Sequence, residues 1–266
     1  MSKLKPFLID SHCHLFSDDY SDLTKVIKEA REERVKYFLN NGSNKKYNEE
    51  LIKMLSNYPN MVGALGIHPE SVEDAGDEDL DFIERNLGYE KIVAIGEIGL
   101  DYYYGKASKE AQIKFLEKQL KMAEKYEMPV VIHSREATQD TISLLQKYNV
   151  KGVIHCFSGS YETAKIYIKM GYKLGVNGVI TFKNANIKEV IKKVGLENIV
   201  LETDSPYLTP EPYRGRQNCP KHVLEVAKFV ADLFDTTLEE VMKVTTNNVL
   251  NTFSKFAKIV SCDEND

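Results

Sequence analysis

Two histidines flank a cysteine directly after the first apolar run of the chain. That run covers residues 7–10, and Ser11-His12-Cys13-His14 follows it. Side chains alternate along a strand, so His12 and His14 should face one way and Cys13 the other. Two imidazoles on one face at a strand end can share a metal ion. An isolated His-x-His is more often structural, so the metal interpretation needs further ligands.

Further candidate ligands stand where other apolar runs end. They are His68, Glu97, His133, His155 and Asp204. Five of the six histidines thus fall at strand ends, whereas random placement would scatter them into helices and loops. This coincidence indicates one shared site rather than several separate structural histidines.

The elements that must position these residues alternate along the chain. Apolar runs predict strands over residues 7–10, 37–40, 62–66, 92–96, 130–132, 152–154, 172–176 and 199–201. Helical patterns cover residues 22–35, 47–58, 78–87, 108–127, 137–148, 160–170, 186–194, 220–234 and 237–254. Most runs are continuously apolar, as expected of parallel strands buried on both faces. We therefore predict an α/β fold, a (β/α)₈ TIM barrel with its site at the C-terminal strand ends.

The barrel prediction also sets the domain organisation. Residues 1–257 are expected to form a single domain, and residues 258–266 a frayed polar tail. The alternative is an open, doubly wound sheet. No G-x-G-x-x-G motif follows the first strand, which weakens that alternative.

The candidate ligands outnumber what one tetrahedral ion needs. Two carboxylates and four imidazoles suit two divalent ions a few ångströms apart, with one carboxylate bridging them. Such pairs activate water for hydrolysis. Mixed nitrogen and oxygen ligation suits zinc, manganese, cobalt or iron better than magnesium alone, although it does not fix which metal is used.

These residues make the sequence familiar. From Asp10 to about Phe253 it resembles the TatD family of metal-dependent deoxyribonucleases, within the amidohydrolase superfamily. The motifs are DSHCH at 10–14, GIHP at 66–69, GEIGLDY at 96–102, HSREA at 133–137, HCFSG at 155–159 and ETDSPYL at 202–208.

The resemblance assigns the ligands to two ions. It implies that His12, His14, Glu97 and Asp204 hold one ion. It further implies that Glu97 bridges to a second ion, which is held by His133 and His155.

The resemblance also implies an activity, the hydrolysis of DNA phosphodiesters, often from the 3′ end of single strands. Our mechanistic hypothesis is that a water shared by the ions attacks phosphorus and that Asp204 accepts its proton. Arg135, two residues past His133, is expected to bind phosphate through its guanidinium fork, with a surface salt bridge as the alternative. His68 is expected to contact the phosphate or the leaving group, with a loop-capping role as the alternative.

Two further carboxylates precede ligand residues by two positions. Asp10 lies two residues before His12, and Glu202 two residues before Asp204. We expect both inside the barrel below the metals, where a carboxylate must be hydrogen-bonded or paired. They would orient metal-bound imidazoles, stabilise the barrel floor, or do both. One departure from the family pattern is Cys219, which stands where the family commonly has glutamate and leaves that residue's substrate contact in doubt.

The composition of the chain limits which partners and cellular settings are expected. The net charge is −5, which argues against a broad grip on nucleic-acid backbones but allows a pocket for one phosphodiester. The four cysteines are scattered without a C-x-x-C pair, so a cytoplasmic setting fits best. No run is long and apolar enough for a membrane span.

Three functions are compatible with these sequence features. The leading one is a nuclease that acts on single-stranded DNA ends. We expect a monomer, because the sequence shows no clear dimer signature, and its protein partners are unknown. The second is a two-metal hydrolase of a small ester, lactone or amide. The third is a non-catalytic binding barrel, against which the complete ligand set argues.

Overall fold

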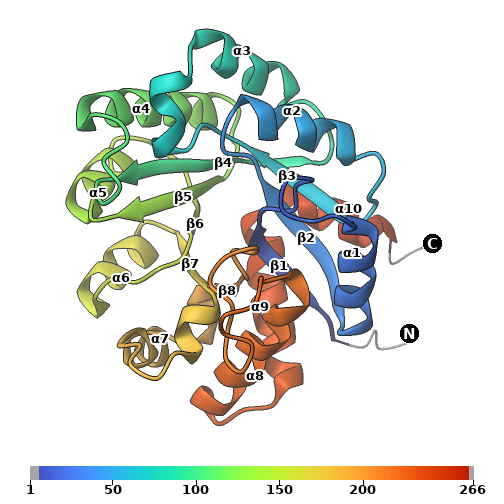
Figure 1. The fold of residues 1–266 in the computed structure, drawn as a ribbon. Coiled ribbons are helices and arrows are strands. Elements are labelled where there is room, and N and C mark those ends of the chain that lie inside the picture. Colours follow the sequence, from blue (N-terminus) through green and yellow to red (C-terminus); the bar gives the residue numbers. More distant parts are fainter. Residues whose placement is uncertain (1–5, 264–266) are drawn as a thin grey trace.

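The computed structural model describes residues 6–263 and shows eight parallel strands arranged around a barrel (Figure 1). Each strand pairs with the next along the chain, in the order β1 to β8. The strands are β1 Leu8–Cys13, β2 Val35–Asn41, β3 Met61–Leu65, β4 Ile92–Asp101, β5 Val130–Arg135, β6 Gly152–Ile154, β7 Lys173–Val176 and β8 Ile199–Leu201. The (β/α)₈ prediction is confirmed, and all eight strands fall where the apolar runs placed them.

Beyond the end of β8, the chain meets β1 and closes the ring. Cys13 and Ser205 form a parallel bridge. The backbone N–H of His14 donates to the carbonyl of Ser205 at 2.7 Å, and the N–H of Asp204 donates to the carbonyl of His12 at 2.9 Å. The closure therefore joins the two chain segments that carry the predicted ligands.

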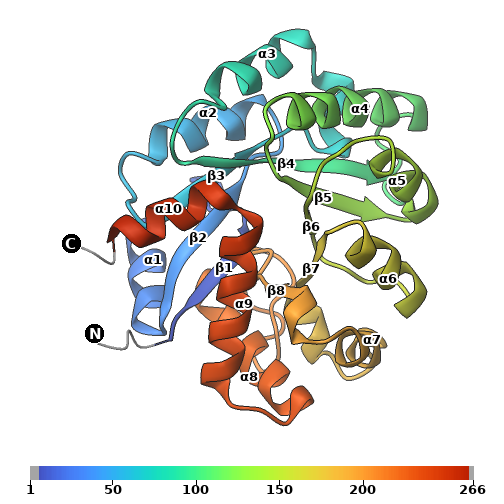
Figure 2. The same cartoon turned by 180° about the vertical axis from the view of Figure 1, so that it is seen from behind.

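Helices surround the strands (Figures 1 and 2). The α-helices are α1 Leu23–Glu32, α2 Lys45–Met54, α3 Asp77–Asn86, α4 Lys109–Lys125, α5 Thr138–Leu145, α6 Tyr161–Lys169, α7 Ile187–Val194, α8 Val223–Phe234, α9 Leu238–Thr252 and α10 Ser254–Asp263. Short 3₁₀ turns are η1 Pro69–Asp74, η2 Gly178–Thr181, η3 Leu196–Asn198 and η4 Pro220–His222. Within residues 6–263, no helix combines the length and apolar character needed to cross a membrane.

Two apolar cores hold the barrel. The larger one lies between strands and surrounding helices, as residues such as Phe38, Leu51 and Ile83 show. The smaller one gathers Ile9, Val131 and their counterparts from other strands around side chains of α9 and α10. Parallel strands covered on both faces need both cores, which explains the continuous apolar runs.

The prediction of a polar tail from residue 258 is wrong for residues 258–263, which belong to α10. Phe256, Ile259 and Val260 of this helix are buried in the smaller core, and the ring of Phe256 lies 6.0 Å from that of Tyr37. The apolar positions are spaced three and four residues apart, the spacing of one helix face, and the intervening polar residues disguised it. Figure 2 shows α9 and α10 together on one side of the strands. Residues 264–266 of the predicted tail lie outside the described residues.

Candidate metal centre

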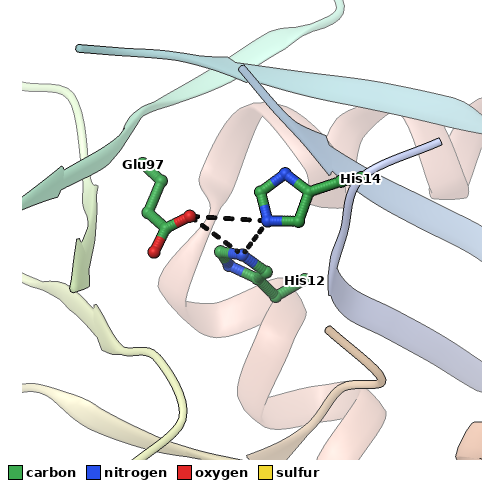
Figure 3. A group of neighbouring side chains, drawn as sticks. All are labelled: His12, His14 and Glu97. Carbon is green, nitrogen blue, oxygen red and sulfur yellow. Dashed lines mark hydrogen bonds and ion pairs between the residues drawn. The ribbon is translucent and has the colours of Figure 1, made fainter. Parts of the chain in front are cut away.

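His12 of β1 and His14, which follows the strand directly, point to a common centre, as the period of a strand requires (Figure 3). Their Nε2 atoms are 3.1 Å apart. Nδ1 of His14 lies 3.0 Å from the carbonyl oxygen of Asn41, which can only accept, so this nitrogen carries the proton. Nε2 of His14 is thereby left with a free lone pair.

Two carboxylates complete this first group of ligand atoms. Oε2 of Glu97 lies 3.4 Å from Nε2 of His12 and 3.5 Å from Nε2 of His14 (Figure 3). Oδ1 of Asp204 lies 3.7 and 3.5 Å from the same two nitrogens. Ligand atoms that share one ion at about 2.0–2.2 Å lie roughly 3.0–3.6 Å apart. The donor set and its spacing therefore fit a divalent metal.

The other oxygen of Glu97 faces a second group of nitrogens. Oε1 lies 2.9 Å from Nδ1 of His133 and 3.9 Å from Nε2 of His155. Nε2 of His155 is also 3.6 Å from Oδ1 of Asp204. Glu97 thus stands between two sets of imidazoles with one oxygen toward each, as a bridging carboxylate would.

Two further carboxylates face the ring nitrogens of His133 and His155 that point away from Glu97. Nε2 of His133 lies 2.9 Å from Oδ2 of Asp101, and Nδ1 of His155 lies 2.9 Å from Oε1 of Glu202. Each carboxylate attracts the proton to the nitrogen that it faces, so the opposite nitrogen keeps its lone pair toward Glu97. A lone pair 2.9 Å from a carboxylate oxygen is stable only when a proton or metal ion lies between them.

His68 has the opposite arrangement. Its Nδ1 accepts the backbone N–H of Glu70 at 3.2 Å, so its proton sits on Nε2, which lies 3.6 Å from Oε1 of Glu97. His68 could share an ion with Glu97 and His133 on distance alone. A protonated nitrogen is no ligand, and the geometry instead gives His68 an N–H donor aimed into the centre.

Burial and mutual charge shape the acidities of these groups. Burial alone would raise the pKa of Glu97, but the facing imidazoles of His68 and His12 hold it well below its usual range. Burial would lower the pKa of His155, but Glu202 and Asp204 raise it to about 10. This many buried carboxylates and imidazoles in one place is costly unless they share protons or cations, which again favours a metal centre.

The predicted floor residues behave differently from each other. Glu202 holds His155, as expected, and also accepts the backbone N–H of Cys156 at 2.8 Å. Asp10 does not contact an imidazole ring. It accepts the hydroxyl and the backbone N–H of Thr203, and burial raises its pKa to about 8. The expectation that Asp10 orients a metal-bound imidazole is therefore wrong.

The reason is local irregularity in β1. The pairing of β1 with β2 slips between Asp10 and Cys13, so counting by twos from His12 fails there. Asp10 instead braces the residue before Asp204. Asp204 itself adopts φ of 57°, in the left-handed region, and its carbonyl accepts the N–H of Tyr207 at 2.8 Å. Such backbone is held only where the surroundings over-determine it, as at functional sites.

Arg135 lies at the mouth of the site, where it is exposed. Its guanidinium carbon is 3.9 Å from the ring centroid of Tyr103 and 4.7 Å from that of Tyr104. Its contact with a substrate phosphate stays a prediction.

Two other cations after β8 have partners within the protein. Lys221 pairs with Glu29 at 2.7 Å, and the guanidinium carbon of Arg214 lies 3.7 Å from the ring centroid of Phe182. Cys219 is half-buried with Sγ 3.7 Å from Nδ1 of His222. Burial raises the pKa of its thiol to about 11, so it contributes no charge toward a substrate.

Sequence reasoning missed the supporting roles of three residues. Asp101 holds His133, Asn41 holds His14 through its carbonyl, and the side chain of Asn218 donates to the carbonyls of Thr203 and Tyr207 at 2.9 and 2.6 Å. For Asp101 a signal existed, because it follows Glu97 by four residues in one strand. A backbone carbonyl carries no such signal.

A (β/α)₈ barrel that gathers histidines and carboxylates at the C-terminal ends of its strands has the architecture of a metal-dependent hydrolase. The chain belongs to the TatD-related DNase family, whose model matches residues 9–254.

Curated relatives and a solved structure agree with this membership. The chain is 38% identical over 251 residues to YabD of Bacillus subtilis, described as an uncharacterized metal-dependent hydrolase, covering 92% of this chain and 98% of that protein. YcfH of Escherichia coli K12, with the same description, is 34% identical over 255 residues, covering 93% and 96%. The crystal structure of YjjV, a TatD homologue from E. coli K12, superposes with a TM-score of 0.88 at 30% identity, covering 93% and 98%. The protein is therefore a metal-dependent hydrolase.

Proposed function

We propose that the protein is a two-metal nuclease that hydrolyses phosphodiester bonds of DNA, working from the 3′ end of single strands. The observation that carries this proposal is that the two carboxylate oxygens of Glu97 face different imidazoles. Oε2 faces His12 and His14, while Oε1 faces His133. Two ions bound on either side of such a carboxylate would polarise the phosphoryl oxygens and acidify a water.

The residues of the chain take distinct roles in this proposal. His12, His14, Glu97 and Asp204 would hold one ion, and Glu97, His133 and His155 would hold the other. Oδ1 of Asp204 faces the imidazoles, which leaves its second oxygen to accept a proton from the attacking water.

Two other residues recognise the phosphate. His68 offers its Nε2–H to a phosphoryl or leaving oxygen, since its Nδ1 is already an acceptor. Arg135 contributes a cation at the mouth. The donor set suits zinc, manganese, cobalt or iron, and magnesium would bind less tightly.

The test is degradation of a 5′-labelled single-stranded DNA oligomer. Metal-stripped protein is resupplied in turn with magnesium, manganese, cobalt, zinc and iron, and bound metal is counted by mass spectrometry. We expect a ladder that shortens from the 3′ end, requires metal and is lost in Glu97→Ala. Absence of cleavage by protein shown to hold two ions would overturn the nuclease proposal.

A second candidate is hydrolysis of a small ester, lactone or amide by the same centre. The pairing of Lys221 with Glu29 favours it, because this cation is not free for a nucleic-acid backbone. Turnover of a neutral ester or lactone without turnover of DNA would establish it. We also propose that the protein acts in the cytoplasm as a monomer; fractionation and light scattering in solution test these two points.

A further inference from the structure

Two tyrosines and an arginine form an exposed group at the mouth of the metal centre. Tyr103 and Tyr104 are 60% and 54% exposed, and their rings stand nearly perpendicular at 5.1 Å between centroids. The guanidinium of Arg135 lies over both rings. We call these three residues the tyrosine–arginine cluster.

One carboxylate ties this cluster to the metal centre. Oδ1 of Asp101 accepts the backbone N–H groups of Tyr103 and Tyr104 at 2.9 and 3.0 Å, while Oδ2 of Asp101 faces His133. Arg135 is the register partner of Asp101 in the pairing of β4 with β5. The cluster therefore begins one side chain away from a metal ligand.

Local packing accounts for the neighbouring tyrosine but not for these two. The hydroxyl of Tyr102 donates to Asp140 at 2.8 Å, and Lys109 lies 4.2 Å from its ring centroid. Tyr102 is thus fixed against the protein. Tyr103 and Tyr104 instead leave large aromatic surface exposed beside a reactive centre, where exposed apolar surface marks a binding site.

We propose that the tyrosine–arginine cluster is a stacking platform for unpaired nucleobases adjoining the phosphodiester at the metal centre. Bases stack on tyrosine rings and guanidinium planes without regard to sequence. Paired bases hide these faces inside a duplex, so the platform selects single strands. The positive charge of Arg135 complements the backbone that carries the bases. The proposal deepens the nuclease proposal and rests on it for the identity of the substrate.

The test compares two oligomers that differ only in their bases. One is a short fluorescein-labelled deoxyadenosine strand, and the other is an abasic strand with the same sugar–phosphate backbone. Phosphorothioate linkages in both resist cleavage, so binding to the metal-loaded protein is followed by fluorescence anisotropy. Cleavage of the normal phosphodiester versions is measured in parallel.

The variants separate stacking from other effects. Tyr103→Ala/Tyr104→Ala removes both rings, and Tyr103→Phe/Tyr104→Phe keeps their faces. Tyr126→Ala is the matched control, because this exposed tyrosine with Lys125 4.8 Å from its ring centroid follows α4 at the opposite end of the barrel. We expect wild-type protein to bind the deoxyadenosine strand about fivefold or more tighter than the abasic strand. The double alanine variant should lose this ratio, whereas the phenylalanine and Tyr126 variants should keep it.

The outcomes separate the two proposals. Equal binding of both strands by wild-type protein that cleaves both overturns the platform and leaves the nuclease standing. An unchanged ratio in the double alanine variant also overturns the platform. Base-dependent binding without cleavage of either strand overturns the nuclease and supports the platform. Binding of neither strand overturns both.

Discussion

Asp101 should control how tightly the second group of nitrogens, those of His133 and His155, binds a metal ion, although Asp101 is not itself a proposed ligand. Its carboxylate is buried and serves His133 through one oxygen and two backbone N–H groups through the other. Burial opposes its ionisation, but the hydrogen bonds from His133 and the backbone hold the pKa of Asp101 at about 2. The group is therefore charged at neutral pH, where it keeps the proton of His133 on Nε2.

Asp101→Asn preserves the shape but offers one acceptor oxygen in place of two. Either the imidazole or the backbone N–H groups must lose their partner. Loss of a hydrogen bond to a charged group costs about 1.5–3 kcal/mol, and loss of a partner behind a ligand lowers metal affinity about 10–100-fold. We expect this weakening for the ion beside His133 and little change for the ion beside His12.

The assay is a titration of metal-stripped protein by calorimetry against a competing chelator. Asp140→Asn is the matched control, because Asp140 accepts a hydrogen bond from the nearby Tyr102 and lies outside the ligand groups. The reasoning is refuted if Asp101→Asn binds both ions as tightly as wild type, or if Asp140→Asn weakens them equally.

Three other substitutions test the centre and its support. A Cβ on Gly175 would clash with Oε2 of Glu202, so Gly175→Ala should displace that carboxylate and lower kcat at least about tenfold. Gly88→Ala is the control, because a Cβ there meets no described atom within 4 Å, and it should leave kcat unchanged. Asp204→Asn should keep the wild-type melting temperature but lose most turnover, and near-normal turnover on DNA would remove its proposed proton-accepting role. Phe256→Ala should destabilise the protein by about 3–5 kcal/mol in chemical denaturation, because Phe256 is fully buried in the smaller core; a loss under about 1 kcal/mol would mean that α10 is dispensable.

The ligand groups could be predicted because two simple periodicities coincide. Strands present alternate residues to one face, and parallel barrel strands end at one rim, so His12, His14 and Glu97 had to converge. Their convergence within 3.5 Å confirms that reasoning. Asp10 escaped it because an irregular pairing in β1 breaks the period.

What surrounds the ligands depends on contacts that no periodicity encodes. The proton position on His14 is fixed by a backbone carbonyl, and that on His68 by a backbone N–H of the following 3₁₀ turn. These two hydrogen bonds prepare the two imidazoles for opposite roles, since His14 keeps a lone pair that could hold a metal ion and His68 keeps an N–H to donate. From the sequence both are simply histidines after strands.

The contrast between residues placed by strand periodicity and contacts outside it also applies to the chemistry of this barrel and its choice of substrate. Hydrolysis depends on atoms fixed by closed, paired strands, so it tolerates little variation. On the proposals made above, recognition depends on the ends of β4 and β5 and on the segment after β8. Exposed tyrosines and an arginine stand there, Lys221 is paired with Glu29, and burial keeps the thiol of Cys219 uncharged. If the substrate is a nucleic acid, stacking of its bases on these tyrosines would add binding that only unpaired strands can offer.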